Sequence, residues 1–134
     1  MKPAIRKFMT ESPHTIGNHQ TLEIAHRMMR EHRVRHLPVL EAGKLVGVIS
    51  QRDLHLIETL EDVDPNDTMV EEAMTTDVYI TGPYAPLEEV AATMAEHKYG
   101  SAVIVDRGKV VGIFTTVDAL SALTQFLHRA SSAA

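Results

Sequence analysis

The sequence contains no cysteine and no tryptophan, and only three phenylalanines and three tyrosines stand among its 134 residues. Without cysteine the chain forms no disulfide, thiolate nucleophile or sulfur-ligated zinc site. Its core must be filled by aliphatic side chains and methionine. No apolar run approaches the roughly 20 residues that span a bilayer, and the N-terminus lacks the apolar segment of a secretory signal. We therefore expect a soluble, cytoplasmic protein with no membrane partner.

Positive charge is also in short supply. The chain has 13 lysines and arginines against 18 aspartates and glutamates, a formal net charge of −5. Because affinity for nucleic acid depends mainly on neutralising phosphates, this balance disfavours a nucleic-acid partner. The sequence has no P-loop, and no Ser-His-Asp set can be assigned from the order of the residues. We therefore expect no catalytic residues, no enzymatic activity and no required cofactor.

Eight histidines raise the question of a metal site. His32 and His36 stand four residues apart, which is the spacing of two ligands on one helix. Pro38 and the change to strand spacing after His36 argue against one continuous helix, and no acid completes an H-E-x-x-H motif. We predict no metal ligands.

What the sequence does contain is an internal repeat. A shift of 65 residues, without a gap, pairs 9–54 with 74–119. The pair Met9-Thr10 recurs as Met74-Thr75, and Gly47 recurs as Gly112. A duplication is the economical explanation.

Each copy shows the same order of patterns. A stretch with helical spacing is followed by two β-branched runs joined by a four-residue loop with glycine in third place, and then by a second helical stretch. The expected helices are 21–32, 53–60, 86–97 and 118–130, and the expected strands are 37–40, 44–50, 102–106 and 109–115. This order predicts an α/β (α+β) fold with two β-α-β-β-α repeats. A small lone sheet is marginal by itself, so we expect the repeats to pack sheet to sheet with pseudo-two-fold symmetry.

The repeat also predicts domain boundaries. Residues 1–57 form the first repeat with an N-terminal lead-in helix, residues 58–67 an acidic linker with a turn at Asp64-Pro65, residues 68–127 the second repeat, and residues 128–134 a C-terminal tail.

The most regular repeated feature is a short motif at the end of the second strand. "GVISQRD" in the first copy and "GIFTTVD" in the second place a hydroxyl three residues before an aspartate, as Ser50 with Asp53 and Thr115 with Asp118. A hydroxyl and a carboxylate at a helix start can bind a ribose and a phosphate. The same pair is also what a helix N-terminus needs for capping. The two interpretations are compatible, and both stay open at this point.

Two ordered copies of this pattern, together with "RHLPVLEAGKLVGVISQRD" and "SAVIVDRGKVVGIFTTVD", resemble a tandem pair of cystathionine β-synthase (CBS) domains, also called a Bateman module. The resemblance covers nearly the whole chain, about 9–56 and 74–123. It implies a regulatory module that binds adenosine-containing ligands in clefts between the repeats. Such ligands include AMP, ADP, ATP, S-adenosylmethionine and cyclic di-adenylate. The resemblance assigns the ribose contacts to Ser50, Asp53, Thr115 and Asp118.

The two copies differ in charge and in ring content. Residues 26–36 gather four arginines and three histidines, whereas the matching stretch of the second copy keeps one histidine and one lysine. If a polyphosphate binds, Arg35, His36 and Arg52 are the phosphate candidates. Solvated charges near a helix end, or contact with an acidic protein surface or the acidic linker, are the alternatives for this cluster. The base-pocket candidates are His14, Pro38, Val48, Tyr79 and Ile113, although a half-buried strand tyrosine is the simpler interpretation of Tyr79.

The sequence therefore predicts a stand-alone regulatory protein that binds an adenosine-containing ligand and signals its occupancy in trans to an unknown effector protein. We also expect a homodimer, with the apolar stretch 119–130 as one candidate interface and packing inside the monomer as the alternative for that stretch. The alternative is a module with empty clefts that serves only dimerisation or protein docking.

Overall fold

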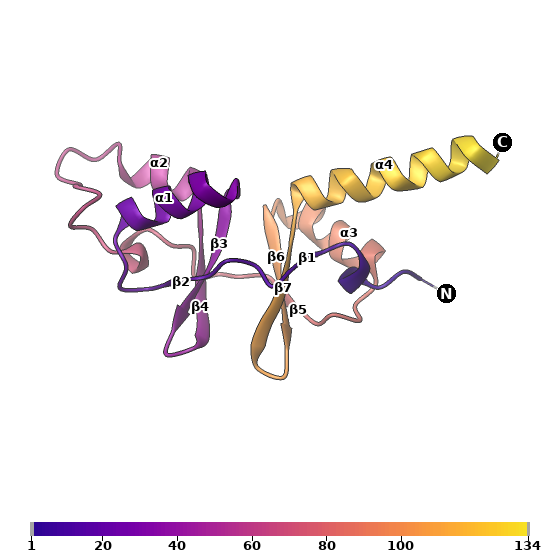
Figure 1. The fold of residues 1–134 in the computed structure, drawn as a ribbon, viewed down its shortest axis with the longest axis horizontal. Coiled ribbons are helices and arrows are strands. Elements are labelled where there is room, and N and C mark those ends of the chain that lie inside the picture. The colour runs from indigo at the N-terminus through magenta and orange to yellow at the C-terminus, as the bar shows by residue number, and fades with distance from the viewer. Residues whose placement is uncertain (1, 134) are drawn as a thin grey trace. The chain divides into compact units, whose positions relative to one another are not determined.

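The computed structural model describes residues 2–133 and divides the chain into two compact units. One unit is Pro13–Val78, and the other joins the residues up to Ser12 with those from Tyr79 onward. Each unit has a small sheet and two α-helices (Figure 1). No helix within residues 2–133 is both long and apolar enough to cross a membrane.

The unit Pro13–Val78 is built around a three-stranded sheet in the order β2-β3-β4, in which β2 and β3 are parallel and β3 and β4 antiparallel. Helix α1 packs against β3 and helix α2 against β4. The elements are β2 (Ile16–Gly17), α1 (Leu22–His32), β3 (His36–Glu41), β4 (Lys44–Ser50), α2 (Gln51–Ile57) and the 3₁₀ helix η2 (Val70–Glu72).

The second unit repeats this plan with a four-stranded sheet in the order β1-β7-β6-β5. Helix α3 packs against β6, and α4 packs against β7. The elements are the 3₁₀ helix η1 (Ile5–Lys7), β1 (Thr10–Glu11), β5 (Ile80–Thr81), α3 (Leu87–His97), β6 (Ser101–Asp106), β7 (Lys109–Thr115) and α4 (Thr116–Ala133).

Each unit has its own core, which is mainly aliphatic. In the unit Pro13–Val78, Leu22, Ala25 and Met29 line the buried face of α1, as their spacing of three and four residues predicts. They pack with the sheet residues Leu37, Val39 and Ile49. The second core contains Ile5, Val90, Met94, Ala102, Ile104 and Phe114.

The hairpin β3–β4 turns at Ala42 and Gly43, whose φ angles are 49° and 81°. Two successive residues with positive φ are typical of the tight turn that favours glycine at its second position. The resulting ladder pairs Glu41 with Lys44 and, at its far end, His36 with Ser50. The hairpin β6–β7 has the same turn and pairs Ser101 with Thr115. Each hairpin therefore delivers the hydroxyl of its motif to one end of its sheet.

The compact units differ from the predicted domain boundaries, because the two lead-in segments are exchanged. We predicted the N-terminal segment as part of the first repeat, but β1 pairs antiparallel with β7 of the second repeat, with Thr10 opposite Ile113. Correspondingly, the segment around Thr75 forms a bridge with Val48 of the first repeat. Backbone hydrogen bonding to a free strand edge decides these positions, and local sequence does not reveal which edge a segment will choose.

Two further boundaries shift. Helix α4 continues past Ala130 to Ala133, so the predicted tail is helical through residue 133 and residue 134 lies outside the described residues. Helix α2 ends at Ile57, earlier than predicted. The lead-in helices are 3₁₀ turns that begin at Ile5 and Val70, again 65 residues apart.

Candidate functional site

The first motif forms a complete capping box at the start of α2. The Ser50 backbone N–H donates to Asp53 Oδ2 at 2.9 Å, and the Ser50 hydroxyl donates to the same oxygen at 2.9 Å. In return, the Asp53 N–H donates to Ser50 Oγ at 3.1 Å. The capping interpretation of the motif is therefore confirmed. Both side chains remain half-buried, so the carboxylate is reachable from solvent.

The second motif has nearly the same geometry at the start of α4. The Thr115 N–H donates to Asp118 Oδ2 at 2.9 Å, and the Thr115 hydroxyl donates to it at 3.2 Å. The Asp118 N–H donates to Thr115 Oγ1 at 3.3 Å. The duplication thus preserves the position of a half-buried carboxylate relative to its sheet.

A third polar group, which the motif does not predict, stands at each aspartate. The Thr75 hydroxyl donates to Asp53 Oδ1 at 3.3 Å and to Oδ2 at 3.4 Å. The Thr10 hydroxyl donates to Asp118 Oδ1 at 3.1 Å and to Oδ2 at 3.3 Å. The only trace of this group in the sequence is the Met-Thr pair that both copies share. The pair does not indicate a position beside the aspartate, because that position depends on pairing with the sheet.

Backbone contacts hold this threonine in place. Thr75 and Val48 exchange two backbone hydrogen bonds of 2.9 and 3.0 Å. The preceding Met74 packs on Gly47, where an added Cβ atom would lie 2.8 Å from the Thr75 carbonyl oxygen. The glycine of the motif therefore allows a close approach of the lead-in segment.

The phosphate candidates gather near the first motif. His36 is the cross-strand partner of Ser50. The carbonyl oxygen of Arg35 accepts a 2.9 Å hydrogen bond from the Gln51 N–H, and Arg52 follows in the first turn of α2. Both arginines are exposed. In the second unit the equivalent positions are Gly100, Ser101 and Val117, so the second motif has no basic residue at these three positions.

The base-pocket candidates fall into three environments. Pro38 and Val48 are buried cross-strand partners, and Ile113 is a buried partner of Val103. The ring of the exposed His14 stacks on His32, with centroids 3.5 Å apart.

Tyr79 is half-buried, lies 5.5 Å from the ring of Tyr99, and packs on the core of its unit. This position agrees with core packing, and it leaves the role of Tyr79 in a base pocket as a prediction.

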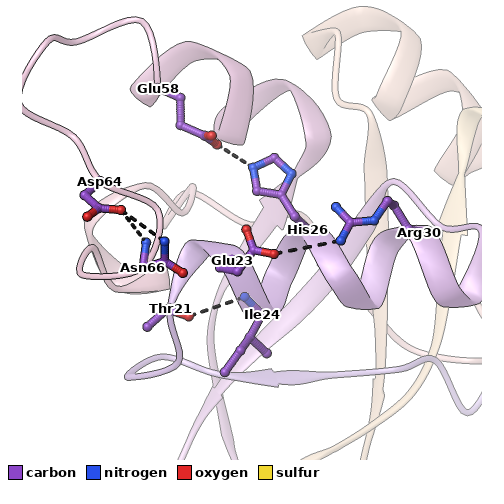
Figure 2. A network of polar contacts seen from close by, with 8 residues as sticks. All are labelled: Thr21, Glu23, Ile24, His26, Arg30, Glu58, Asp64 and Asn66. Atoms are coloured by element: carbon purple, nitrogen blue, oxygen red, sulfur yellow. Dashed lines mark hydrogen bonds and ion pairs between the residues drawn. The ribbon is translucent and has the colours of Figure 1, made fainter.

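Part of the basic cluster is directed at acidic side chains of its own unit (Figure 2). His26 Nε2 lies 2.6 Å from Glu58 Oε2, at the beginning of the predicted acidic linker. Arg30 pairs loosely with Glu23 at 3.8 Å. Asp64 accepts a 2.9 Å hydrogen bond from the Asn66 N–H and forms the predicted turn. His26 and Arg30 thus have acidic partners within their own unit, as one alternative for the basic cluster predicts.

His32 and His36 do not share a helix, because α1 ends at His32 and β3 begins at His36. Across residues 2–133, no three histidine or acidic side chains come together in a group able to hold a metal ion.

Comparison with known proteins gives consistent matches over most of the chain. A family model for the CBS domain matches residues 5–56 and 70–125. The CBS domain-containing protein YhcV of Bacillus subtilis is 32% identical over 136 aligned positions, covering 94% of this chain and 96% of YhcV.

Two solved structures extend this likeness. The protein AcuB from Vibrio cholerae has a TM-score of 0.86 and 32% identity, with 98% of each chain covered. The CBS domain pair of protein MJ0100, solved with 5′-methylthioadenosine and S-adenosyl-L-methionine, has a TM-score of 0.84 and 25% identity, covering 93% of this chain and 98% of that one. The predicted α/β fold with two β-α-β-β-α repeats is confirmed by these likenesses.

Proposed function

We propose that this chain, which belongs to the CBS domain family and contains two CBS domains, is a regulatory protein that binds adenosine-containing ligands at its two repeated motifs. The observation that carries the proposal is the half-buried carboxylate at each sheet end, Asp53 and Asp118, held in the same way in both units. The similar MJ0100 pair is a complex with two adenosine derivatives, which supports a ligand of this class.

The carboxylate geometry suits a ribose. Oδ2 of Asp53 is engaged by the cap, whereas Oδ1 faces the Thr75 hydroxyl at 3.3 Å. A carboxylate oxygen has lone pairs for more than one donor. Oδ1 can therefore accept a hydrogen bond from a ribose hydroxyl while the helix cap stays intact, so capping and ligand binding use different oxygens of one side chain.

The charge around the first motif points to a phosphorylated ligand there. Arg35, His36 and Arg52 are the proposed phosphate contacts, and arginine pairs with phosphate through two parallel hydrogen bonds. Pro38 and Val48 would contact the base in this unit, with His14 at the edge of the site. Ile113 and Tyr79 would contact the base in the other unit. The proposed ligands are AMP, ADP, ATP or S-adenosylmethionine.

The proposed output is a population shift. A ligand that binds one conformation better increases the population of that conformation, which an effector protein can read in trans. We also propose a homodimer, because α4 exposes Val117, Leu120, Leu123 and Leu127 by 53 to 62%. Exposed apolar residues along one helix favour burial against a second helix. The role is regulatory and needs no catalytic group.

The experiment is isothermal titration of the wild-type chain with AMP, ADP, ATP, S-adenosylmethionine and cyclic di-adenylate, alongside the double variant Asp53→Asn, Asp118→Asn. We expect saturable binding that the double variant weakens at least tenfold, because an amide replaces the oxygen that faces the ribose. Glu72→Gln is the matched control, since Glu72 accepts a 2.8 Å hydrogen bond from the Met69 N–H in a different helix cap. Absence of binding to every ligand would favour the docking module.

A further inference from the structure

We infer that Met9 and Met74 are sites of reversible oxidation, at which a hydroperoxide converts the thioether to a sulfoxide and releases the lead-in segment from its sheet. The two methionines stand 65 residues apart, at the same position of both copies, directly before Thr10 and Thr75. The release of the segment can be measured without any ligand, whereas its effect on ligand binding rests on the proposed function.

The first support is the position of the two sulfur atoms. A Cβ atom on Gly47 would lie 2.7 Å from Met74 Sδ and 3.1 Å from Met74 Cγ. A Cβ atom on Gly112 would lie 2.9 Å from both Cγ and Cε of Met9, and Met9 Sδ takes part in the same contact. Each thioether therefore packs directly on the glycine of a motif, and an oxygen atom added to the sulfur has no space on that side.

The second support is that a small oxidant can reach both residues. Met9 and Met74 are half-buried and pack at the edge of the core of their unit. Met29 and Met94, by contrast, are only 6% and 5% exposed. Because a peroxide must reach the sulfur from solvent, the half-buried methionines should be oxidised before the buried ones.

The reaction balances with a hydroperoxide as the oxidant. A lone pair of the sulfur attacks the terminal peroxide oxygen, and the O–O bond breaks as the S–O bond forms. The proton on that oxygen passes to the leaving alkoxide or hydroxide, which departs as an alcohol or as water. The sulfur is thereby oxidised and the peroxide reduced. Methionine sulfoxide reductases, which draw their electrons from thiols, reverse the step.

The sulfoxide should not stay in this contact. It is polar and chiral, and it disrupts packing that suits an apolar side chain. Burying its oxygen without a hydrogen bond is unfavourable, so the side chain should leave the glycine for solvent. Thr75 is attached by two backbone hydrogen bonds to Val48, and β1 pairs with β7 over two residues. Attachments this short can open locally, so the oxidised segment should detach at this point.

The functional consequence is a loss of ligand affinity. Detachment frees the edge of β4 at Val48, a proposed base contact, and moves Thr75 away from the motif aspartate that it contacts at 3.3 Å. In the other unit, detachment of β1 exposes the edge of β7 at Ile113 in the same way. Oxidation would therefore couple the proposed ligand binding to the amount of peroxide.

The test compares untreated and peroxide-treated wild type with Met9→Leu, Met74→Leu, which keeps apolar packing of similar volume but cannot form a sulfoxide. Met28→Leu, Met69→Leu is the matched control, because it removes two other half-buried methionines. The oxidant is hydrogen peroxide, and peptide mass spectrometry locates each added oxygen. Amide hydrogen exchange without ligand measures the release, and isothermal titration with AMP measures binding.

In treated wild type and in the treated control variant, we expect amide exchange in residues 9–11 and 74–76 to become about tenfold faster. AMP binding should weaken about fivefold in both proteins, and a methionine sulfoxide reductase should restore it, whereas the leucine variant should change less than about twofold. Met9→Gln, Met74→Gln places a polar side chain at both positions without oxidant, so it should show the same faster exchange.

Sulfoxides at Met9 and Met74 with unchanged exchange would overturn the inference, and so would an equal loss of affinity in the treated leucine variant. An absence of oxidation at both positions would overturn it as well. If untreated wild type does not bind AMP but oxidation still accelerates exchange, the release stands while the proposed function loses its support.

Discussion

Met74 packs its thioether so closely against Gly47 that a Cβ atom on the glycine would stand 2.7 Å from the sulfur. The same position lies 2.8 Å from the Thr75 carbonyl oxygen, which belongs to the backbone and cannot move without breaking the bridge to Val48. The contact places the lead-in segment against β4 and sets the threonine beside the aspartate of the motif.

Gly47→Ala should therefore lower the free energy of unfolding by about 2 kcal/mol, within the usual range for overpacking. Urea denaturation measures the change. Gly82→Ala is the control, because a Cβ atom there meets nothing within 4 Å. Equal stability of the two variants would show that the Met74 contact relaxes without cost.

Removing the capping hydroxyl tests the structural part of the motif. Thr115→Ala leaves the Asp118 N–H without the acceptor that it has at 3.3 Å, and Ser50→Ala does the same for Asp53. Each should lose about 1 kcal/mol of unfolding free energy, as for other N-caps. Ser121→Ala, on the exposed face of α4, should be neutral or slightly stabilising. A loss below the error of urea denaturation in both cap variants would contradict the assignment.

The buried amide of Asn18 joins two acidic side chains. Its Nδ2 donates to Glu41 Oε1 and to Glu71 Oε2, both at 3.1 Å, and its residue is 6% exposed. Asn18→Asp replaces the donor by a third carboxylate, so we expect a loss of about 2 kcal/mol near neutral pH.

The three carboxylates of this variant repel one another, and the repulsion disappears when they take up protons. The stability difference between Asn18→Asp and wild type should therefore shrink as the pH is lowered from about 7 to about 4. Urea denaturation at several pH values measures it. Gln20→Glu, an exposed acid two residues away, should change little. A difference that stays constant with pH would point to lost packing instead of charge.

The cationic surrounding of the first motif predicts a preference for phosphates. Arg35→Gln, Arg52→Gln should weaken ATP binding by about tenfold and adenosine binding by less than about twofold, since only ATP carries charge to pair with. The ATP effect should decline with added salt. Arg27→Gln, Arg129→Gln removes the same charge from other positions and serves as control. Equal losses in the two double variants would indicate a general effect of net charge.

The exposed leucines of α4 predict self-association. Leu120→Ser, Leu127→Ser should convert a dimer into a monomer in light scattering after gel filtration, because each replacement removes apolar surface from the shared face. Ser121→Ala, Gln125→Ala, on the same helix, should keep the wild-type mass. A wild-type chain that is monomeric at all concentrations would exclude this interface.

Much of the fold could be predicted because its signals are local. Helix periodicity, the glycines of the hairpin turns and the hydroxyl-aspartate spacing act within a few residues, and α1, the two hairpins and both caps follow them. The repeat added the order of the elements, since a duplication applies the same local rules twice. These features, together with the absence of cysteine chemistry, were determined by the sequence by itself.

The tertiary structure alone decided which sheet edge each lead-in segment joins. Thr10 and Thr75 are distant in sequence from Asp118 and Asp53. A Met-Thr pair does not by itself predict the strand with which it will pair. That choice depends on the free edges of β7 and β4 and on the space left by Gly112 and Gly47. Backbone pairing and close packing act between distant segments, so the third group of each site becomes visible only once the chain is folded.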